Sequence, residues 1–232
     1  MDTHYDIVQM QSAQSTQDEA SNALATTGVP TLVVADRQTR GRGRQGREWV
    51  QPDRALFSSF SFPSQWDPKD LPLVPLCTGV AVRRAIRKTV GTSVDLKWPN
   101  DLLVGGRKIG GILVEATGGR VTIGCGLNLW WPDAPPSTAA LYVDDPGGSL
   151  ALDIAQHWVA EISAMVRGDA SSWPCVEYSD ACVTIGSKVS WSDGSGVALR
   201  VSERGHLVVA TEHGSVELSS GEVHLGDTPL IS

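Results

Sequence analysis

Three segments of the chain show the apolar spacing or the end signals of an α-helix. Residues 16–28 open with Thr16 and Glu19 at the spacing of a capping box and close at Gly28, which tolerates a left-handed turn. Apolar side chains that recur every three or four positions predict helices with one buried face. This period runs through two further segments, residues 71–90 and 151–167.

Strand patterns occupy much of the chain between these helices. A continuous apolar run at 30–36 predicts a buried strand, and the alternation of apolar and small polar residues at 55–62 predicts a half-buried one. Glycine pairs separate three apolar runs over 101–127, which is typical of a meander. Residues 132–149 are rich in Pro, Gly, Asp and Ser and predict a loop.

The character of the sequence changes near residue 180. Short Val- and Leu-rich segments follow, separated by turn signals at Asp193-Gly194, Arg204-Gly205 and His213-Gly214. Such regular short strands predict a small β-barrel, so we expect two domains, residues 1–180 and 181–232. Helices mixed with strands before this point give the class α+β.

Composition and charge narrow the function classes. The 232 residues are 41% hydrophobic and carry a net charge of −7, which favours a globular protein over a nucleic-acid coat or an anionic-membrane binder. No apolar run is long enough to span a bilayer, and the N-terminus lacks a secretory signal pattern. The four cysteines form no CxxC, so we expect reduced thiols in a cytoplasmic protein.

The basic charge is concentrated in one loop. Residues 37–47 hold five arginines and three glycines but no acid. Glycines let a backbone fold closely around a ligand, and arginines bind phosphate or carboxylate with forked donors. The loop therefore predicts an anion site, with a solvated loop or an RNA-binding segment as alternatives. Neither a P-loop nor a Rossmann fingerprint is present.

The segment KWPND, residues 97–101, is the second candidate. Val94 and Leu96 alternate with the residues beside them, which puts Lys97 on the opposite face of a strand that Pro99 ends. A lysine held there could pair with a carboxylate that is becoming an acyl phosphate. Asp101 is an oxygen ligand of the kind Mg²⁺ accepts. The alternative is a polar turn with Trp98 in the core.

Two glycine-containing strands are the third candidate. Gly110 and Gly111 lie within RKIGGILVE at 107–115, and paired glycines in a strand indicate close approach by a ligand or another backbone, or a bulge. Asn128 ends the motif GCGLN, where it could be a turn residue or a ligand for ribose or metal.

Together these motifs resemble those of the biotin–protein ligases. The resemblance rests on GRGRQGREW at 41–49, KWPND, RKIGGILVE and GCGLN, and it extends to SSGEVHL at 219–225. It implies a mixed-sheet catalytic domain of the class II synthetase-like, biotin–lipoate ligase type, followed by an SH3-like barrel. The chain lacks the helix-turn-helix domain that often comes first in the family, so it resembles the short type. It also has Gln17 where the family commonly has Asn.

The resemblance implies an enzyme that joins biotin and ATP to form biotinyl-5′-AMP and pyrophosphate, with Mg²⁺. The biotinyl group then passes to one lysine of a biotin carboxyl carrier protein domain. Two anions must be brought together, so cations rather than an acid–base pair are needed. The implied catalytic residues are Lys97, Arg42 and Arg44.

The same resemblance implies the ligand-binding residues. A neutral ureido ring would be held by uncharged hydrogen-bonding groups, although Thr16 competes as a helix cap. Packing within the loop is the alternative for Trp49, and an exposed hairpin charge is the alternative for Lys108. The implied biotin residues are Ser15, Thr16, Gln17, Gln38, Gly41, Arg42, Gly43, Arg44, Lys97, Gly110 and Gly111. The implied ATP residues are Arg42, Arg44, Arg47, Trp49, Asn100, Lys108 and Asn128, with Asp101 for metal.

Three other functions compete with this interpretation. A lipoate–protein ligase or octanoyltransferase shares the expected fold, but the arginine loop together with KWPND matches the biotin branch. A nucleic-acid module is disfavoured by the acidic balance and by a loop without interleaved aromatic residues. A catalytically inactive biotin sensor is disfavoured by the intact Lys97, Arg42 and Arg44. We expect no DNA or membrane partner, a monomer or homodimer, and a loop that orders over the adenylate.

Overall fold

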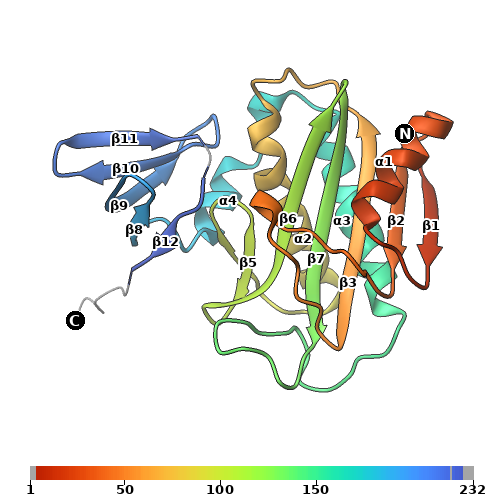
Figure 1. Cartoon of the computed structure of the whole chain (residues 1–232). Coiled ribbons are helices and arrows are strands. Elements are labelled where there is room, and N and C mark those ends of the chain that lie inside the picture. The colour runs from red at the N-terminus through yellow and green to blue at the C-terminus, as the bar shows by residue number, and fades with distance from the viewer. Residues whose placement is uncertain (1–3, 220, 227–232) are drawn as a thin grey trace.

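The computed structural model describes residues 4–219 and 221–226, and its larger part is a seven-stranded sheet with helices on both faces (Figure 1). The strand order is β1-β2-β3-β7-β6-β5-β4, in which β1 and β2 run parallel and the other neighbours antiparallel. The strands are β1 (Asp6–Met10), β2 (Thr31–Ala35), β3 (Arg54–Pro63), β4 (Asp95–Lys97), β5 (Asp101–Val104), β6 (Arg107–Thr117) and β7 (Arg120–Trp130).

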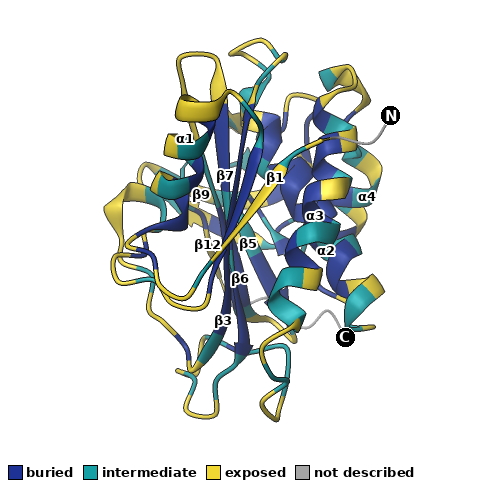
Figure 2. Ribbon diagram, turned by 90° about the vertical axis from the view of Figure 1, so that its right-hand side faces the viewer, coloured by how far each residue is buried: buried dark blue, intermediate teal, exposed yellow. Residues whose placement is uncertain are grey.

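The three predicted helices are confirmed. Helices α2 and α3 cover one face of the sheet and α1 covers the other (Figure 2). Gly28 ends α1 at a φ of 72°, as its position predicted. The predicted capping box is wrong, because Ser15 is the N-cap and makes no side-chain cap bond. The helices are α1 (Thr16–Thr27), α2 (Val74–Thr89), α3 (Leu150–Val166) and α4 (Cys175–Ala181), with 3₁₀ turns at Arg44–Gly46, Leu71–Leu73 and Ala170–Ser172.

Strand β3 is buried along almost its whole length, so the prediction of a half-buried strand is wrong. Its polar positions suggested a solvated face, but α1 lies over that face. The serine hydroxyls are hydrogen-bonded inside the protein, for example Ser61 with the Thr122 hydroxyl at 2.9 Å. Small polar side chains on β3 therefore face an internal polar layer instead of water.

The glycine-separated meander of β5, β6 and β7 is confirmed, and two elements were not predicted. Strand β1 is a largely exposed edge strand with little periodic signal (Figure 2). It is held by parallel pairing with β2, which lies far along the chain beyond α1. Helix α4 has seven residues, too few to show a helical period.

The C-terminal part is a second sheet of short strands, as the turn signals predicted. Its order is β11-β10-β9-β8-β12, and within the described residues its two end strands are not paired with each other, so the sheet is open. The closed barrel is therefore not seen, and residues 220 and 227–232 of it lie outside the described residues. The strands are β8 (Lys188–Trp191), β9 (Gly194–Val201), β10 (Leu207–Thr211), β11 (Gly214–Leu218) and β12 (His224–Leu225).

The second sheet is joined to the first through buried tryptophans. The Trp98 Nε1 donates to the Gly205 carbonyl at 2.9 Å, and the Trp173 Nε1 donates to the Glu203 carbonyl at 2.8 Å. The backbone N–H of Val183 donates to the carbonyl of Leu96 on β4 at 2.9 Å. One hydrophobic cluster continues from the helices into both sheets. The turn that contains Gly205 is thus fixed against the first sheet.

Two simple features bear on the environment of the chain. Among the described residues, no helix is long and apolar enough to cross a membrane. All four cysteines are free, and Cys175 is the one that is not buried. Burial raises the pKa of the Cys77 thiol to about 12, and it also raises the pKa of the Cys125 thiol.

We expect Cys175 to react with thiol reagents faster than the three buried cysteines. The thiolate is the reactive form, so the buried thiols react slowly in the folded protein. A chromogenic disulfide reagent should label Cys175 rapidly and the other three cysteines only after unfolding in guanidinium. Rapid labelling of Cys77 or Cys125 in the native protein would contradict the packing described.

Gly110 should be essential for the sheet. A Cβ there would lie 2.5 Å from the Gly126 carbonyl oxygen and 2.5 Å from a Leu127 methyl group, and neither atom can move cheaply. We expect Gly110→Ala to cost about 1–3 kcal/mol or more in free energy of unfolding, as overpacking does. Gly148, which has no atom within 4 Å of its ideal Cβ, supplies the matched control. Equal melting temperatures for Gly110→Ala and Gly148→Ala would disprove this.

Candidate active site

A cavity of about 230 Å³ opens on the face of the sheet that α1 partly covers. The arginine loop lies over it, and the turn between β4 and β5 closes one end. Of the residues implied to bind substrates, the cavity brings together Ser15, Thr16, Gln17, Gln38, Arg42, Gly43, Arg44, Arg47, Trp49, Lys97, Asn100, Asp101, Lys108 and Gly111.

Glycines form the floor of the cavity. Gly111 on β6 and Gly126 on β7 are cross-strand partners, and Gly124 lies two positions away on the same face. A Cβ added at Gly111 or Gly126 would lie 3.3 or 3.1 Å from the Trp49 ring, and one at Gly124 would lie 2.6 Å from the Gln17 Oε1. The glycines therefore let Trp49 and Gln17 lie directly on the backbone.

Neutral hydrogen-bonding groups line the end of the cavity at the start of α1. Thr16 donates to the Gln38 Oε1 from its backbone N–H at 2.8 Å and from its hydroxyl at 3.1 Å. The Gln17 Nε2 donates to the Thr122 carbonyl at 3.0 Å. Ser15, Thr16 and Gln17 are buried. The side chains of Thr16, Gln17 and Gln38 therefore offer polar atoms without a formal charge.

Three arginines of the loop are each held by a different element. Arg42 forms a two-pronged ion pair with Asp18 at 2.8 and 2.6 Å, which raises the pKa of Arg42 and lowers that of Asp18. The pair is thus fully ionised at neutral pH and is lost only as pH falls through the lowered pKa of Asp18. The other two contacts are Arg44 with the Asn100 Oδ1 at 3.0 Å and Arg47 with Glu222 at 2.8 Å.

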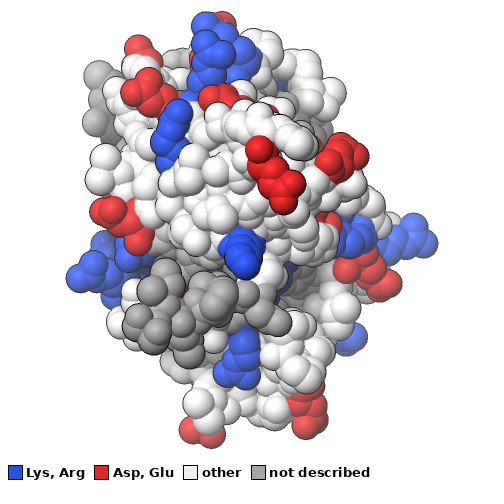
Figure 3. Space-filling view, turned by 90° about the vertical axis from the view of Figure 1, so that its left-hand side faces the viewer, with Lys and Arg blue, Asp and Glu red and all other residues white. Residues whose placement is uncertain are grey.

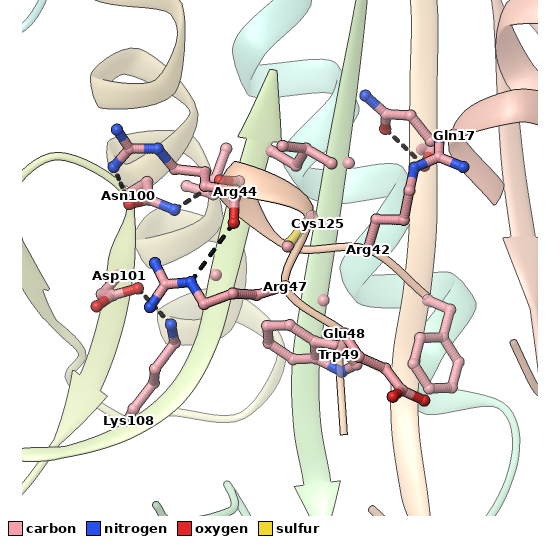
Figure 4. Close-up of a pocket in the computed structure, with 18 of the residues that line it drawn as sticks. Gln17, Arg42, Arg44, Arg47, Glu48, Trp49, Asn100, Asp101, Lys108 and Cys125 are labelled. Atoms are coloured by element: carbon pink, nitrogen blue, oxygen red, sulfur yellow. Dashed lines mark hydrogen bonds and ion pairs between the residues drawn. The ribbon is translucent and has the colours of Figure 1, made fainter. Parts of the chain in front are cut away.

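The loop turns sharply between these arginines. Gln45 has a φ of 57°, a left-handed conformation that is uncommon for a residue with a side chain, and Gly46 follows with a φ of 72°. Arg44, before this turn, bonds to Asn100 and has its pKa lowered by burial (Figure 4). Arg47, after the turn, pairs with Glu222. The hydrogen bond with Arg47 lowers the pKa of Glu222.

Two lysines and one carboxylate meet at the other end of the cavity. The β4–β5 register pairs Lys97 with Asp101, and their charged groups lie 3.6 Å apart. The Lys108 Nζ is 2.5 Å from the other Asp101 oxygen (Figure 4). KWPND is therefore a turn that also lines the cavity, and the prediction of Trp98 as a core residue is confirmed.

Asn100 and Trp49 complete this cationic end. The Asn100 side chain donates to the Ile112 carbonyl at 2.8 Å while it accepts from Arg44, so it fixes the arginine to β6. The Lys108 Nζ lies 5.9 Å from the centre of the Trp49 ring. The Trp49 Nε1 is buried without a hydrogen-bond partner among the described residues. A flat ring beside several cations suits a planar, anionic ligand.

The donor set does not form a metal site on its own. No group of three or more His, Cys, Asp or Glu side chains that could hold an ion occurs within residues 4–219 and 221–226. Asp101, the residue implied for metal, is already bound by two ammonium groups. Mg²⁺ would therefore have to enter with the phosphates of a nucleotide, as it commonly does.

Three of the implied site residues do not line the cavity. Gly110 contacts β7 backbone, and Gly41 lies between Gln38 and Trp49. Asn128 is buried, and its amide donates to the Ala139 carbonyl at 2.9 Å. Asn128 thus anchors the loop that follows β7, and its nucleotide role stays a prediction.

Sequence reasoning also missed several lining residues. Ser59 lies on β3 at a position that looked solvent-facing, and α1 over that face was the missing information. Glu222 and Val223 come from the far end of the chain, where SSGEVHL was the available signal. Others are Glu48, Phe57, Ser58, Pro99, Ile112, Leu113, Gly124, Cys125 and Gly126.

The basic side chains on one face of the molecule are dispersed. In the view of Figure 3, Lys and Arg side chains are interspersed with Asp and Glu, and no continuous basic field covers that face. Of the five arginines of the loop, Arg42, Arg44 and Arg47 line the cavity, and Arg42 and Arg47 are also paired with acids.

Comparisons with known proteins agree with this geometry. Residues 7–128 match the model of the biotin/lipoate A/B protein ligase family. The bifunctional ligase/repressor BirA of Bacillus subtilis is 38% identical over 126 residues, which cover 52% of this chain but 38% of that protein. The chain thus spans about two fifths of that relative. Biotin--[acetyl-CoA-carboxylase] ligase of Mycobacterium tuberculosis is 28% identical over 92% of this chain and 86% of its own length.

A solved structure extends the likeness to nearly the whole fold. Biotin protein ligase from Aquifex aeolicus, in complex with biotin and ATP, superposes with a TM-score of 0.79 at 26% identity. The match covers 97% of this chain and all of that one. The mixed sheet and its helices are therefore those of the biotin protein ligase fold. By its family match, its fold and the motifs that meet in its cavity, the chain belongs to the biotin/lipoate A/B protein ligase family.

Proposed function

We propose that the chain is a biotin–protein ligase, which activates biotin with ATP and transfers the biotinyl group to a lysine of a biotin carboxyl carrier protein domain. The observation that carries this proposal is the division of one cavity into two ends. Uncharged donors and acceptors from α1 and Gln38 lie at one end, and Lys97, Lys108 and Arg44 lie at the other. Biotin has the same polarity, with a neutral ureido ring and an anionic carboxylate.

The first step joins two anions. A biotin carboxylate oxygen attacks the α-phosphorus of ATP, the bond to the bridging oxygen breaks, and pyrophosphate leaves with its electron pair. Lys97 and Arg44 would bind the carboxylate and the α-phosphate and stabilise the charge that builds up. Arg42 can join them only by leaving Asp18. Mg²⁺ would accompany the phosphates as part of the nucleotide substrate.

The second step transfers the activated group. The amine of the acceptor lysine attacks the carbonyl carbon of biotinyl-5′-AMP, the mixed-anhydride C–O bond breaks, and AMP leaves. The amine gives its proton to solvent. The closed loop would keep water from the anhydride until the acceptor arrives. The ring of Trp49 above the glycine floor would contact the adenine.

The comparisons support the biotin branch of the family over the lipoate branch. The relatives named above are biotin ligases, and the similar solved structure contains biotin and ATP. Four free cysteines agree with action in the cytoplasm. The carrier domain would be the macromolecular partner, and we propose no role for DNA or membrane.

Biotin-dependent exchange of labelled pyrophosphate into ATP tests the adenylation step. We expect exchange with biotin but not with lipoate, and a loss of about 10²–10³-fold in Lys97→Ala, because one cation is removed from the developing charge. Lys88→Ala, which changes an exposed lysine near the end of α2, should match the wild type. A folded wild-type protein that shows no exchange with biotin in the presence of Mg²⁺ would refute the ligase proposal.

Limited proteolysis tests closure of the loop. The basic loop has several trypsin sites, and its contacts with Asp18 and Glu222 are surface ion pairs. Biotin with ATP should add buried contacts and slow cleavage within residues 37–47. The C-terminal turn at Arg204, far from the loop in sequence, gives an internal reference. Cleavage of the loop at equal rates with and without both substrates would contradict the closure.

A further inference from the structure

A chain of buried polar groups joins β3 to the start of α1 beneath the neutral end of the cavity. The Ser59 hydroxyl lies 2.8 Å from the Thr16 hydroxyl and 3.2 Å from the Gln17 Oε1. The Thr16 hydroxyl lies 3.1 Å from the Gln38 Oε1. Ser59, Thr16 and Gln17 are 1%, 3% and 4% exposed, so solvent does little to satisfy these atoms.

The backbone fixes the orientation of both amides at the ends of this chain. The Thr16 backbone N–H can only donate, so the Gln38 atom that faces it must be the oxygen. The Thr122 carbonyl can only accept, so the Gln17 atom that faces it must be the nitrogen. Gln38 and Gln17 therefore both present carbonyl oxygens, which are acceptors, to the Thr16 and Ser59 hydroxyls between them.

These contacts need one more hydrogen than the hydroxyls of Thr16 and Ser59 supply. The three oxygen–oxygen contacts, Gln38–Thr16, Thr16–Ser59 and Ser59–Gln17, would each need one hydrogen. The two hydroxyls supply one hydrogen each. One of the three contacts therefore has no hydrogen between its oxygens, and lone pairs stay available to which a ligand N–H group can bond. A ligand without such a donor leaves the deficit in place.

We propose that Ser59 is a positioning residue for the biotin head group, and that it presents Thr16 and Gln17 as acceptors for a ureido N–H. Ser59 holds Thr16 and Gln17 together from below. Gly124 leaves room for Gln17, since a Cβ there would lie 2.6 Å from the Gln17 oxygen. The longer amide at position 17 thus keeps its oxygen at the ureido end. This inference rests on the proposed function and assigns the basis of its preference for biotin.

Acceptors at this end of the cavity would distinguish biotin from lipoate and octanoate. Biotin carries two ureido N–H donors on its ring. Lipoate and octanoate carry a carboxylate on an aliphatic chain, and their other end has no N–H group. Their carboxylates would pair with the cations at one end of the cavity, but they would bring no N–H group to the acceptors at the other end. A site built to hydrogen-bond a donor rejects analogues that lack it, because buried polar atoms then stay unpaired.

The test compares Ser59→Ala with Ser61→Ala. Ser61 lies on the same strand and face, is fully buried and forms a similar hydroxyl pair with Thr122, but it does not line the cavity. We expect Ser59→Ala to raise the KM for biotin in pyrophosphate exchange and its Kd by calorimetry about tenfold, as loss of a buried hydrogen bond predicts. The KM for ATP should stay near the wild-type value. Ser61→Ala should lower thermal stability and leave both KM values unchanged.

Three outcomes separate this proposal from the ligase assignment. No exchange by the wild type overturns the ligase proposal, and this inference with it. An active wild type in which Ser59→Ala binds biotin as Ser61→Ala does overturns only the role of Ser59. Desthiobiotin keeps the ureido ring without the sulfur. If Ser59→Ala loses as much affinity for desthiobiotin as for biotin, the role of Ser59 is supported. If its affinity for desthiobiotin is unchanged, that role is refuted. If Ser59→Ala does not fold, Ser59→Cys against Ser61→Cys gives the same comparison.

Discussion

The cavity depends on a stretch of sheet that carries no side chains on one face. Gly111, Gly124 and Gly126 leave the backbones of β6 and β7 bare, and Trp49 and Gln17 lie directly against them. A larger residue at any of these positions would lift a cavity-lining side chain away from the sheet. The residues that alternate with these glycines on β7, Cys125 and Leu127, carry side chains that are buried in the hydrophobic core.

This arrangement explains why the functional groups come from distant parts of the sequence. The bare floor is central in the sheet, so every wall has to be brought to it. The start of α1 supplies neutral groups, and the β4–β5 turn supplies Lys97 and Asp101. The arginine loop covers the floor, and Glu222 reaches it from the C-terminal part. Trp98 links these regions, since its neighbours line the cavity while its indole binds Gly205.

The sequence was informative where local chemistry decides structure. Glycine pairs with positive φ at 105–106 and 118–119 made the meander predictable, and KWPND and the arginine loop indicated the cavity. Position-specific contacts were not predictable. Thr16 had capping-box spacing, but its hydroxyl is used by Gln38 and Ser59, which lie 22 and 43 residues away. The burial of β3 and the pairing of Arg47 with Glu222 likewise depend on packing between distant segments.

The contacts that hold the arginine loop depend on the salt concentration around the protein. Two of its three side-chain anchors, Arg42–Asp18 and Arg47–Glu222, are ion pairs at least partly open to solvent. Dissolved salt weakens such pairs, because charges are screened over about 8 Å at physiological ionic strength. The third anchor, Arg44 with Asn100, is partly buried and less affected. Ionic strength therefore sets how firmly Arg42 and Arg47 are held, while Arg44 between them stays attached to the turn beside the lysines.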